Sequence, residues 1–197
     1  MSHQESPSEH HPISQPELQQ VSFPHTLRND GRALTHLDET GKTYLEPLQP
    51  HDFAFSDCLR RDGFSTAETI ETADGTRMLR FSENTDIIPF ANILNASLRL
   101  EDGKEETAEV TRRLADLLQG VYKRYGRLPG IGTVDDIAVE RASGKVELLA
   151  PFTTSAEHTP ATILDRVRAD AVARSKSADE VDVLQGSFMR AYKELRS

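Results

Sequence analysis

The sequence predicts an α+β protein, in which antiparallel β-hairpins are followed by a long amphipathic helix, a further hairpin and two C-terminal helices. Three observations predict this order. Short segments flank polar, glycine-containing connections of the length that hairpins use. Apolar residues recur with a helical period from residue 104 to about residue 125. The chain has 197 residues, which is enough for one domain with its own core.

Residues 1–24 are expected to form a disordered tail, with residues 25–197 as a single domain behind it. Apolar residues in the tail show no period, and polar residues and prolines surround them: Pro7, Pro12, Pro16 and Pro24. Three histidines also lie there: His3, His10 and His11. Without cysteines or closely spaced carboxylates beside them, we interpret these histidines as solvated residues and not as metal ligands.

Two hairpins are predicted to open the domain. The first spans residues 33–48 around a turn at 38–42, and the second spans 66–81 around a turn at 73–75, where Gly75 can adopt the positive φ of a tight turn. A short helix is expected between them, at residues 50–59. Its apolar side chains should pack on the sheet: Phe53, Phe55 and Leu59. Residues 25–100 would then form a small β-rich lobe and residues 101–197 a helical lobe.

Residues 86–100 fit neither a strand nor a helix period, so the sequence leaves their structure open. The helix over residues 104–125 is the strongest signal, with acidic residues near its start, basic residues near its end, and Gly126 and Pro129 after it. A third hairpin is expected over residues 134–150. Thr159-Pro160 and Ser177 mark the starts of the last two helices.

Composition excludes several classes of protein. A net charge of −9 disfavours binding to nucleic acid, because phosphates would be repelled. No apolar run approaches the roughly 20 residues of a membrane span, so no membrane association is expected. The single cysteine, Cys58, cannot form an internal disulfide and has no evident activating partner. We interpret Cys58 as a small core residue, and the chain as cytoplasmic.

Common catalytic and nucleotide-binding motifs do not occur in the chain. The loop Pro129–Thr133 contains two glycines whose amides could cradle an anion, but it follows a helix and precedes a strand, the reverse of the dinucleotide-binding context, so a plain turn is the favoured interpretation. Asp135 and Asp136 are adjacent carboxylates that could bind Mg²⁺ together with other oxygen ligands, or simply face solvent. His36, His51 and His158 lie in different elements, and the sequence assigns none of them a role as a base.

From residue 104 to residue 150 the order of elements resembles the catalytic-loop region of the protein-kinase-like superfamily. The features are the long helix, a loop, Asp135-Asp136-Ile137-Ala138-Val139-Glu140, the Ser143-Gly144-Lys145 turn and Val146-Glu147-Leu148-Leu149-Ala150. The resemblance implies that the earlier hairpins form an N-terminal lobe. It also implies that Asp136 takes the place of the metal-binding asparagine.

The chain departs from that family at its catalytic positions. Ile131 stands where the resemblance would put the catalytic aspartate, and Ala150 stands where it would put the aspartate that ends the second strand. The candidate N-lobe strand contains no lysine and offers only Arg77 and Arg80, and no glycine-rich nucleotide loop precedes it. The resemblance therefore implies a degenerate, pseudokinase-type scaffold without phosphotransfer.

These observations favour a non-catalytic binding or regulatory module with a protein partner, no cofactor and no metal. One alternative is a divergent phosphotransferase that binds a Mg-nucleotide through Asp135 and Asp136. Another is a homodimeric assembly protein that associates through an apolar stripe on its last helix. The stripe consists of Leu184, Phe188, Tyr192 and Leu195. The same stripe would also suit the core of the domain itself.

Overall fold

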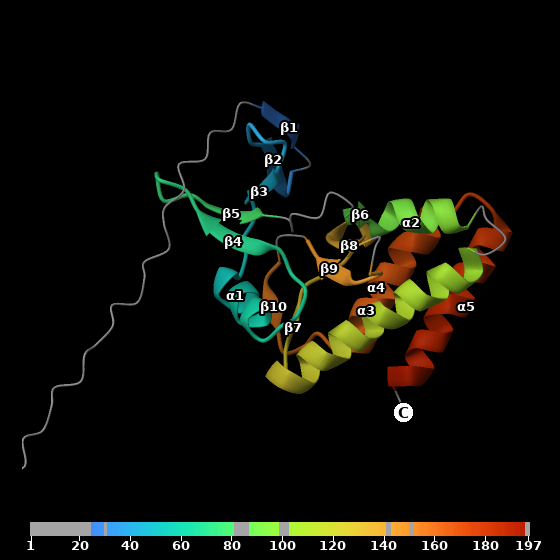
Figure 1. Ribbon diagram of the computed structural model, residues 1–197. Helices are drawn as coiled ribbons and strands as arrows, with labels where there is room; N and C mark the ends of the chain where they lie inside the picture. The colour runs from blue at the N-terminus through green and yellow to red at the C-terminus, as the bar shows by residue number, and fades with distance from the viewer. Residues whose placement is uncertain are drawn as a thin grey trace, which may run out of the picture.

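A computed structural model describes residues 25–29, 31–80, 87–98, 103–140, 143–149 and 152–195. No side chain is described for residues 25–29, 87–89 and 97. Within these ranges the fold is mixed α+β, with antiparallel sheets, a long helix and two C-terminal helices, which confirms the predicted class (Figure 1). The predicted tail, with His3, His10 and His11, lies outside the described residues.

The first part of the chain forms a five-stranded antiparallel sheet. Its strands are β1 (His25–Asn29), β2 (Ala33–Leu37), β3 (Thr43–Pro47), β4 (Glu68–Glu71) and β5 (Arg77–Arg80), in the order β1-β2-β3-β5-β4. Both predicted N-terminal hairpins are confirmed, as β2 with β3 and as β4 with β5. The strand β1, which the sequence did not predict, adds a further hairpin in front of them.

The β2–β3 turn is fixed by the carboxylate of Asp38. It accepts hydrogen bonds from the amides of Thr40 (2.8 Å) and Lys42 (2.9 Å) and from the hydroxyl of Tyr44 (2.9 Å). Burial opposes ionisation of Asp38, but these bonds and one from the Thr40 hydroxyl outweigh it and lower the pKa to about 2. The β4–β5 turn has Gly75 at φ +85°, as the sequence predicted.

Helix α1 (Phe53–Arg61) connects β3 to β4, where a helix was expected. Asp52 caps it by accepting a hydrogen bond from the Phe55 amide at 2.9 Å. Phe55 and Leu59 are buried, while Phe53 is half-buried. Cys58 is partly exposed instead of filling the core.

Residues 86–100, which the sequence left open, contain both kinds of element. Ile87–Pro89 forms β6 and Phe90–Ser97 forms α2. Strand β6 pairs with β8 (Ile137–Glu140), which pairs with β9 (Val146–Leu148), in an antiparallel three-stranded sheet. The predicted strand over 134–140 is therefore wrong in its first three residues, because Val134–Asp136 forms the 3-10 turn η1.

Three helices form the other half of the molecule. They are α3 (Gly103–Tyr125), α4 (Pro160–Ala173) and α5 (Ala178–Leu195). Figure 1 shows α3 and α5 running side by side, with α4 packed against α5. Two short strands in the stretch of chain from α3 to α4, β7 (Leu128–Pro129) and β10 (Thr154–Ser155), form an antiparallel pair. The predicted helices are all confirmed.

The apolar stripe on α5 belongs to the core of the domain. Leu184 is 1% exposed and Phe188 is fully buried, and both pack within the main hydrophobic cluster. Tyr192 and Leu195 are partly buried against that cluster. Of the two interpretations of this stripe, the structure therefore supports the internal one, because a buried side chain offers no surface to a second copy.

The two sheets are joined through Leu148 of β9. Its carbonyl accepts a hydrogen bond from the Ala67 amide, and its own amide donates to the Ser65 carbonyl, both at 3.2 Å. Thr66 thereby forms a parallel bridge with Leu148. This contact connects the segment that leads into β4 with the sheet that faces the helices.

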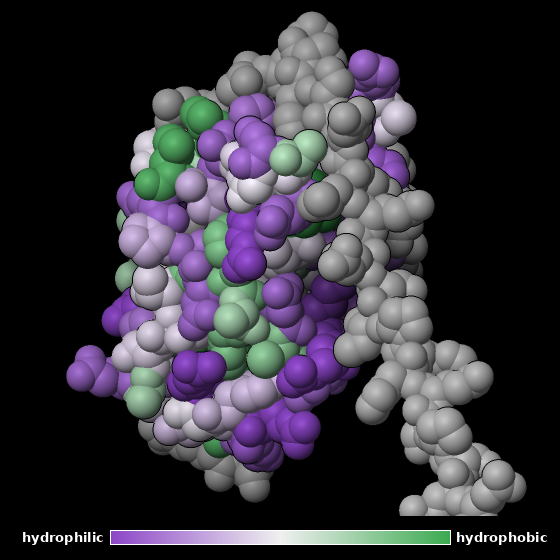
Figure 2. Space-filling model, turned by 90° about the vertical axis from the view of Figure 1, so that its left-hand side faces the viewer, coloured by the Kyte–Doolittle hydropathy of each residue, from purple (hydrophilic) through white to green (hydrophobic). Residues whose placement is uncertain are grey.

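The face of the molecule in Figure 2 carries mainly hydrophilic residues, and its hydrophobic residues lie in small groups where atoms are coloured. Among the described residues the large hydrophobic side chains that are exposed are Leu48 (48%) and Met189 (54%). No helix within the described ranges combines the length and the hydrophobicity that crossing a membrane requires.

Candidate functional site

Asp136, one of the two predicted site residues, lies at a junction between the five-stranded sheet and the helical half. Its side chain is 2% exposed. One carboxylate oxygen, Oδ2, accepts hydrogen bonds from the amides of Gly132 (2.8 Å) and Thr133 (3.0 Å). These bonds fold the loop back on itself, which explains why η1 forms here in place of a strand.

The other oxygen of Asp136 is bound by Arg32. The Arg32 Nη1 donates to Asp136 Oδ1 at 2.6 Å, across a separation of 104 residues in the chain. Arg32 follows Gly31 in the connection between β1 and β2, and Gly31 has a φ of +78°. This backbone geometry lets the hairpin connection turn, so that it can present Arg32 to the helical half. The side chain of Arg32 remains 33% exposed.

Asp135, the second predicted site residue, binds a different arginine. Its Oδ2 accepts a hydrogen bond from Arg174 Nη2 at 2.8 Å, at the end of α4. Arg174 also pairs with Asp170, and Asp170 in turn accepts a hydrogen bond from the Val134 amide at 2.9 Å. The hydrogen bond with Asp135 raises the pKa of Arg174. Asp135 is thus part of a half-exposed network that ties η1 to α4.

The structure does not bring Asp135 and Asp136 together as a pair of free ligands. A carboxylate can accept about four hydrogen bonds, and Asp136 uses at least three of them within the protein. Each carboxylate is also neutralised by its own arginine. Among the described residues no cluster of three or more acidic, histidine or cysteine side chains has the arrangement of a metal site. The main chemical effect of this junction is to hold two parts of the fold together.

The arginines of the candidate N-lobe strand also have partners within their own sheet. Arg80 binds Glu68, and Arg77 pairs with Glu71 at 3.3 Å and lies over the ring of Phe53 at 5.8 Å. Arg80 has a raised pKa, because its bonds to Glu68 outweigh the opposing effect of burial. Both arginines therefore bind within the sheet, and Arg77 also contacts α1.

The histidines are distributed over separate contacts. His36 lies 2.9 Å from Glu46 on the neighbouring strand, and His158 lies 3.1 Å from Arg166. His51 accepts a hydrogen bond at Nδ1 from the Phe152 amide at 3.1 Å. Burial lowers the pKa of His51 to about 4, although Asp52 and Asp57 act in the opposite direction. His51 is therefore neutral near pH 7 and serves as an acceptor.

The glycine loop between β7 and η1 is a structural turn that packs against the segment after β9. The Gly130 amide donates to the Thr153 carbonyl at 2.8 Å, and a Cβ added at Gly130 would lie 3.1 Å from that oxygen. Close packing of two backbones thus explains this glycine. The Gly132 amide is occupied by Asp136.

Sequence reasoning missed Arg32, which completes the junction. The one local signal that could have pointed to it is the neighbouring Gly31, because glycine is typical of a turn. Comparison with models of known protein families and with curated proteins found no match to the chain. The interpretation of the junction therefore depends on its geometry.

Proposed function

We propose that the chain is a non-catalytic binding module built on a degenerate protein-kinase-like scaffold. The observation that carries this proposal is the bond between Arg32 and Asp136. It connects the hairpin of β1 and β2 to the loop in front of β8, and Asp136 is almost fully buried there.

In protein kinases a glycine-rich loop covers the nucleotide phosphates, and an asparagine of the catalytic loop helps to hold Mg²⁺ beneath them. The resemblance assigns that asparagine's position to Asp136. In this chain the β1–β2 connection supplies Arg32 to the same side chain. A guanidinium would then occupy the position where the metal and the phosphates have to lie. The junction would thus be closed by the protein itself.

Two further features support the non-catalytic interpretation. Ile131, at the position that the resemblance gives to the catalytic aspartate, is 1% exposed and belongs to the main hydrophobic cluster. An isoleucine cannot accept a proton, and its burial also keeps a substrate hydroxyl away. The candidate N-lobe strand β5 contains no lysine, and α2, the next helix along the chain, contains no glutamate, so the ion pair that active kinases use has no counterpart in these two elements.

The proposal is tested by thermal unfolding with and without ATP and Mg²⁺. We expect the wild-type midpoint to stay unchanged, because Arg32 closes the position that the nucleotide would need. A ligand at a hundred times its dissociation constant would add about 2.7 kcal/mol, which such a measurement detects easily. The Arg32→Ala variant, checked for folding by circular dichroism, is measured in parallel.

Stabilisation of the wild type by Mg-ATP, abolished by Asp136→Asn, would contradict the proposal and favour the divergent phosphotransferase. No stabilisation in the wild type agrees with it. Stabilisation of Arg32→Ala alone would agree as well, and would identify Arg32 as the group that excludes the nucleotide.

A further inference from the structure

The 3-10 turn η1 is connected to both halves of the molecule by two adjacent carboxylates. Asp136 binds Arg32 of the β1–β2 connection at 2.6 Å. Asp135 binds Arg174, just after α4, at 2.8 Å. A turn of three residues, Val134–Asp136, thus holds one arginine from the five-stranded sheet and one from the helical half. A change in the position of either arginine acts on the same short turn.

On the side of the sheet, the backbone of Arg32 is tied to the end of β3. Its carbonyl accepts a hydrogen bond from the Leu48 amide at 2.8 Å. The position of Arg32 therefore follows the position of the hairpin. Its guanidinium binds a carboxylate, that of Asp136, which is only 2% exposed. Withdrawal of Arg32 would leave this charge buried and unpaired, which costs several kcal/mol in proteins.

The turn has a second state, in which the Asp136 side chain points into water. In the closed state Asp136 Oδ2 accepts hydrogen bonds from the amides of Gly132 and Thr133 at 2.8 and 3.0 Å. Without Arg32, hydration is the cheapest way to relieve the unpaired carboxylate. The two amides then lose their acceptor, so that the loop in front of β8 and η1 change conformation together.

On the side of the helices, η1 contacts the end of α4 in more than one way. The Val134 amide donates to Asp170 at 2.9 Å, and Asp170 also pairs with Arg174 at 3.1 Å. The Val134 side chain is 1% exposed and belongs to the main hydrophobic cluster. A rearrangement of η1 therefore removes both polar partners and packing from the residues at which α4 ends.

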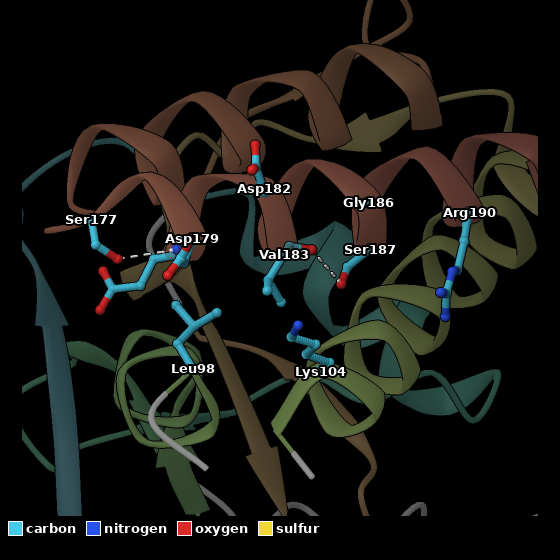
Figure 3. A pocket seen from close by; sticks show the side chains of 10 residues that line it. Leu98, Lys104, Ser177, Asp179, Asp182, Val183, Gly186, Ser187 and Arg190 are labelled. Carbon is cyan, nitrogen blue, oxygen red and sulfur yellow. Dashed lines mark hydrogen bonds between the residues drawn. The ribbon is translucent and has the colours of Figure 1, made fainter. Parts of the chain in front are cut away.

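We propose that η1 is a conformational switch, which couples the position of the β1–β2 hairpin to the connection between α4 and α5. With Arg32 bound, η1 is closed and Arg174 is fixed; with Arg32 withdrawn, η1 opens and the end of α4 loosens. These contacts carry the inference independently of the kinase-like resemblance. The connection leads into a groove along α5, whose lining residues include Ser177 and Asp179 (Figure 3). The switch thus acts at one end of that groove.

The test measures hydrogen exchange of individual amides by NMR, on the full chain and without nucleotide. In Arg32→Ala we expect the Val134 amide to exchange at least about tenfold faster, because its bond to the α4 carboxylate is lost when η1 opens. The Arg174 amide, at the end of α4, should exchange at least about threefold faster. The Ile163 amide, which binds the Thr159 carbonyl at the start of α4, should stay unchanged.

Arg174→Ala provides the reciprocal measurement. Coupling between two sites acts equally in both directions, so this variant should accelerate exchange of the Gly132 and Thr133 amides at least about threefold. Arg174 is 41% exposed, so its replacement leaves the fold intact, and this arm decides the matter even where Arg32→Ala fails to fold. Arg77→Ala is the matched control, since it removes an ion pair of the same sheet that does not contact η1.

Unchanged exchange at Gly132 and Thr133 in Arg174→Ala, or at Arg174 in a folded Arg32→Ala, would overturn the proposal. Equal acceleration at Ile163, or in Arg77→Ala, would overturn it too, because the effect would then not pass through η1. In the variant with both arginines replaced, the two effects on Val134 should combine to less than their product, and a full product would count against a shared switch. Nucleotide is absent throughout, so failure here is distinct from failure of the proposed function.

Discussion

The junction at Asp136 and the groove along α5 differ in whether their charged side chains have partners. Asp136 is 2% exposed, and its carboxylate accepts hydrogen bonds from Arg32 and two backbone amides, so its charge is compensated inside the fold. Lys104 and Arg190 line an open groove along α5 together with three carboxylates, Asp179, Glu180 and Asp182, and neither cation has a hydrogen-bond or ion-pair partner among the described residues. Removing one partner of a buried, hydrogen-bonded ion pair is strongly destabilising, because it leaves the other charge buried and unpaired, whereas removing an exposed charge without partners costs little. The contrast indicates that the charges of the junction hold parts of the fold together, whereas Lys104 and Arg190 contribute little to its stability.

The largest expected effect comes from Asp136→Ala. This variant leaves Arg32 and the amides of Gly132 and Thr133 without their acceptor, and we expect a loss of about 3 kcal/mol or more in the free energy of unfolding. Asp135→Ala is the matched control, because Asp135 is 48% exposed, and it should cost less than about 1 kcal/mol. Urea unfolding measures both variants. Equal losses would remove the distinction between a structural and a peripheral carboxylate.

Acid should weaken the fold through His51, which has a buried acceptor nitrogen. Its pKa falls from an ordinary 6.5 to about 4 in the folded state, because burial disfavours the charged ring. The unfolded chain therefore binds more protons between these values, and stability falls as the pH decreases from about 6.5 to 4. One proton contributes at most about 1.4 kcal/mol per pH unit, and the partial exposure of the ring makes the effect smaller.

His51→Asn checks this assignment, since the asparagine oxygen can still accept the Phe152 amide but does not titrate. Thermal midpoints of both proteins are compared at pH 7 and pH 5. We expect the thermal midpoints at pH 7 and pH 5 to differ less in the variant than in the wild type. An unchanged difference between the midpoints would show that other titrating groups cause the loss of stability in acid.

Replacement of two glycines by alanine should have smaller and opposite effects on stability. Gly186→Ala should stabilise the protein by up to about 1 kcal/mol, because alanine favours the helix and the added methyl meets open space. Gly75→Ala should destabilise it by roughly 1 to 2 kcal/mol, because Gly75 has a φ of +85° in its turn. Thermal unfolding measures both. A loss of stability in Gly186→Ala would show that packing explains that glycine after all.

The smallest effect is expected for Arg190→Gln. Because Arg190 has no partner among the described residues, its replacement should change the free energy of unfolding by less than about 0.5 kcal/mol. Arg174→Gln is the comparison, since Arg174 binds both Asp135 and Asp170, and it should cost up to about 1 kcal/mol. A larger loss of unfolding free energy in Arg190→Gln would show that this side chain stabilises the fold.

Local signals in the sequence predicted most of the fold. Gly75 marked a turn, and the apolar period from residue 104 to 125 predicted α3, because both depend only on neighbouring residues. The 3-10 turn at Val134–Asp136 was not predicted, because it depends on the way in which the Asp136 side chain binds its own backbone. Residues 86–100 escaped prediction because a strand changes directly into a helix at Phe90.

The candidate site was predicted only in part. Asp135 and Asp136 were selected as adjacent carboxylates, but their neighbours come from distant parts of the chain. Arg32 is 104 residues away from Asp136, and no pattern in the sequence connects them. A charge without a partner is a property of the folded arrangement, so Lys104 and Arg190 look like any other surface residues in the sequence.

The bridge between Thr66 and Leu148 has a consequence for biosynthesis. These two residues are 82 positions apart, and the strand that ends at Leu148 belongs to the second half of the chain. At ordinary rates of translation the five-stranded sheet is complete on the order of ten seconds before Leu148 is made. During that interval the backbone groups of Ser65 and Ala67 have no partner strand. The nascent chain would thus expose this segment to chaperones until synthesis reaches β9.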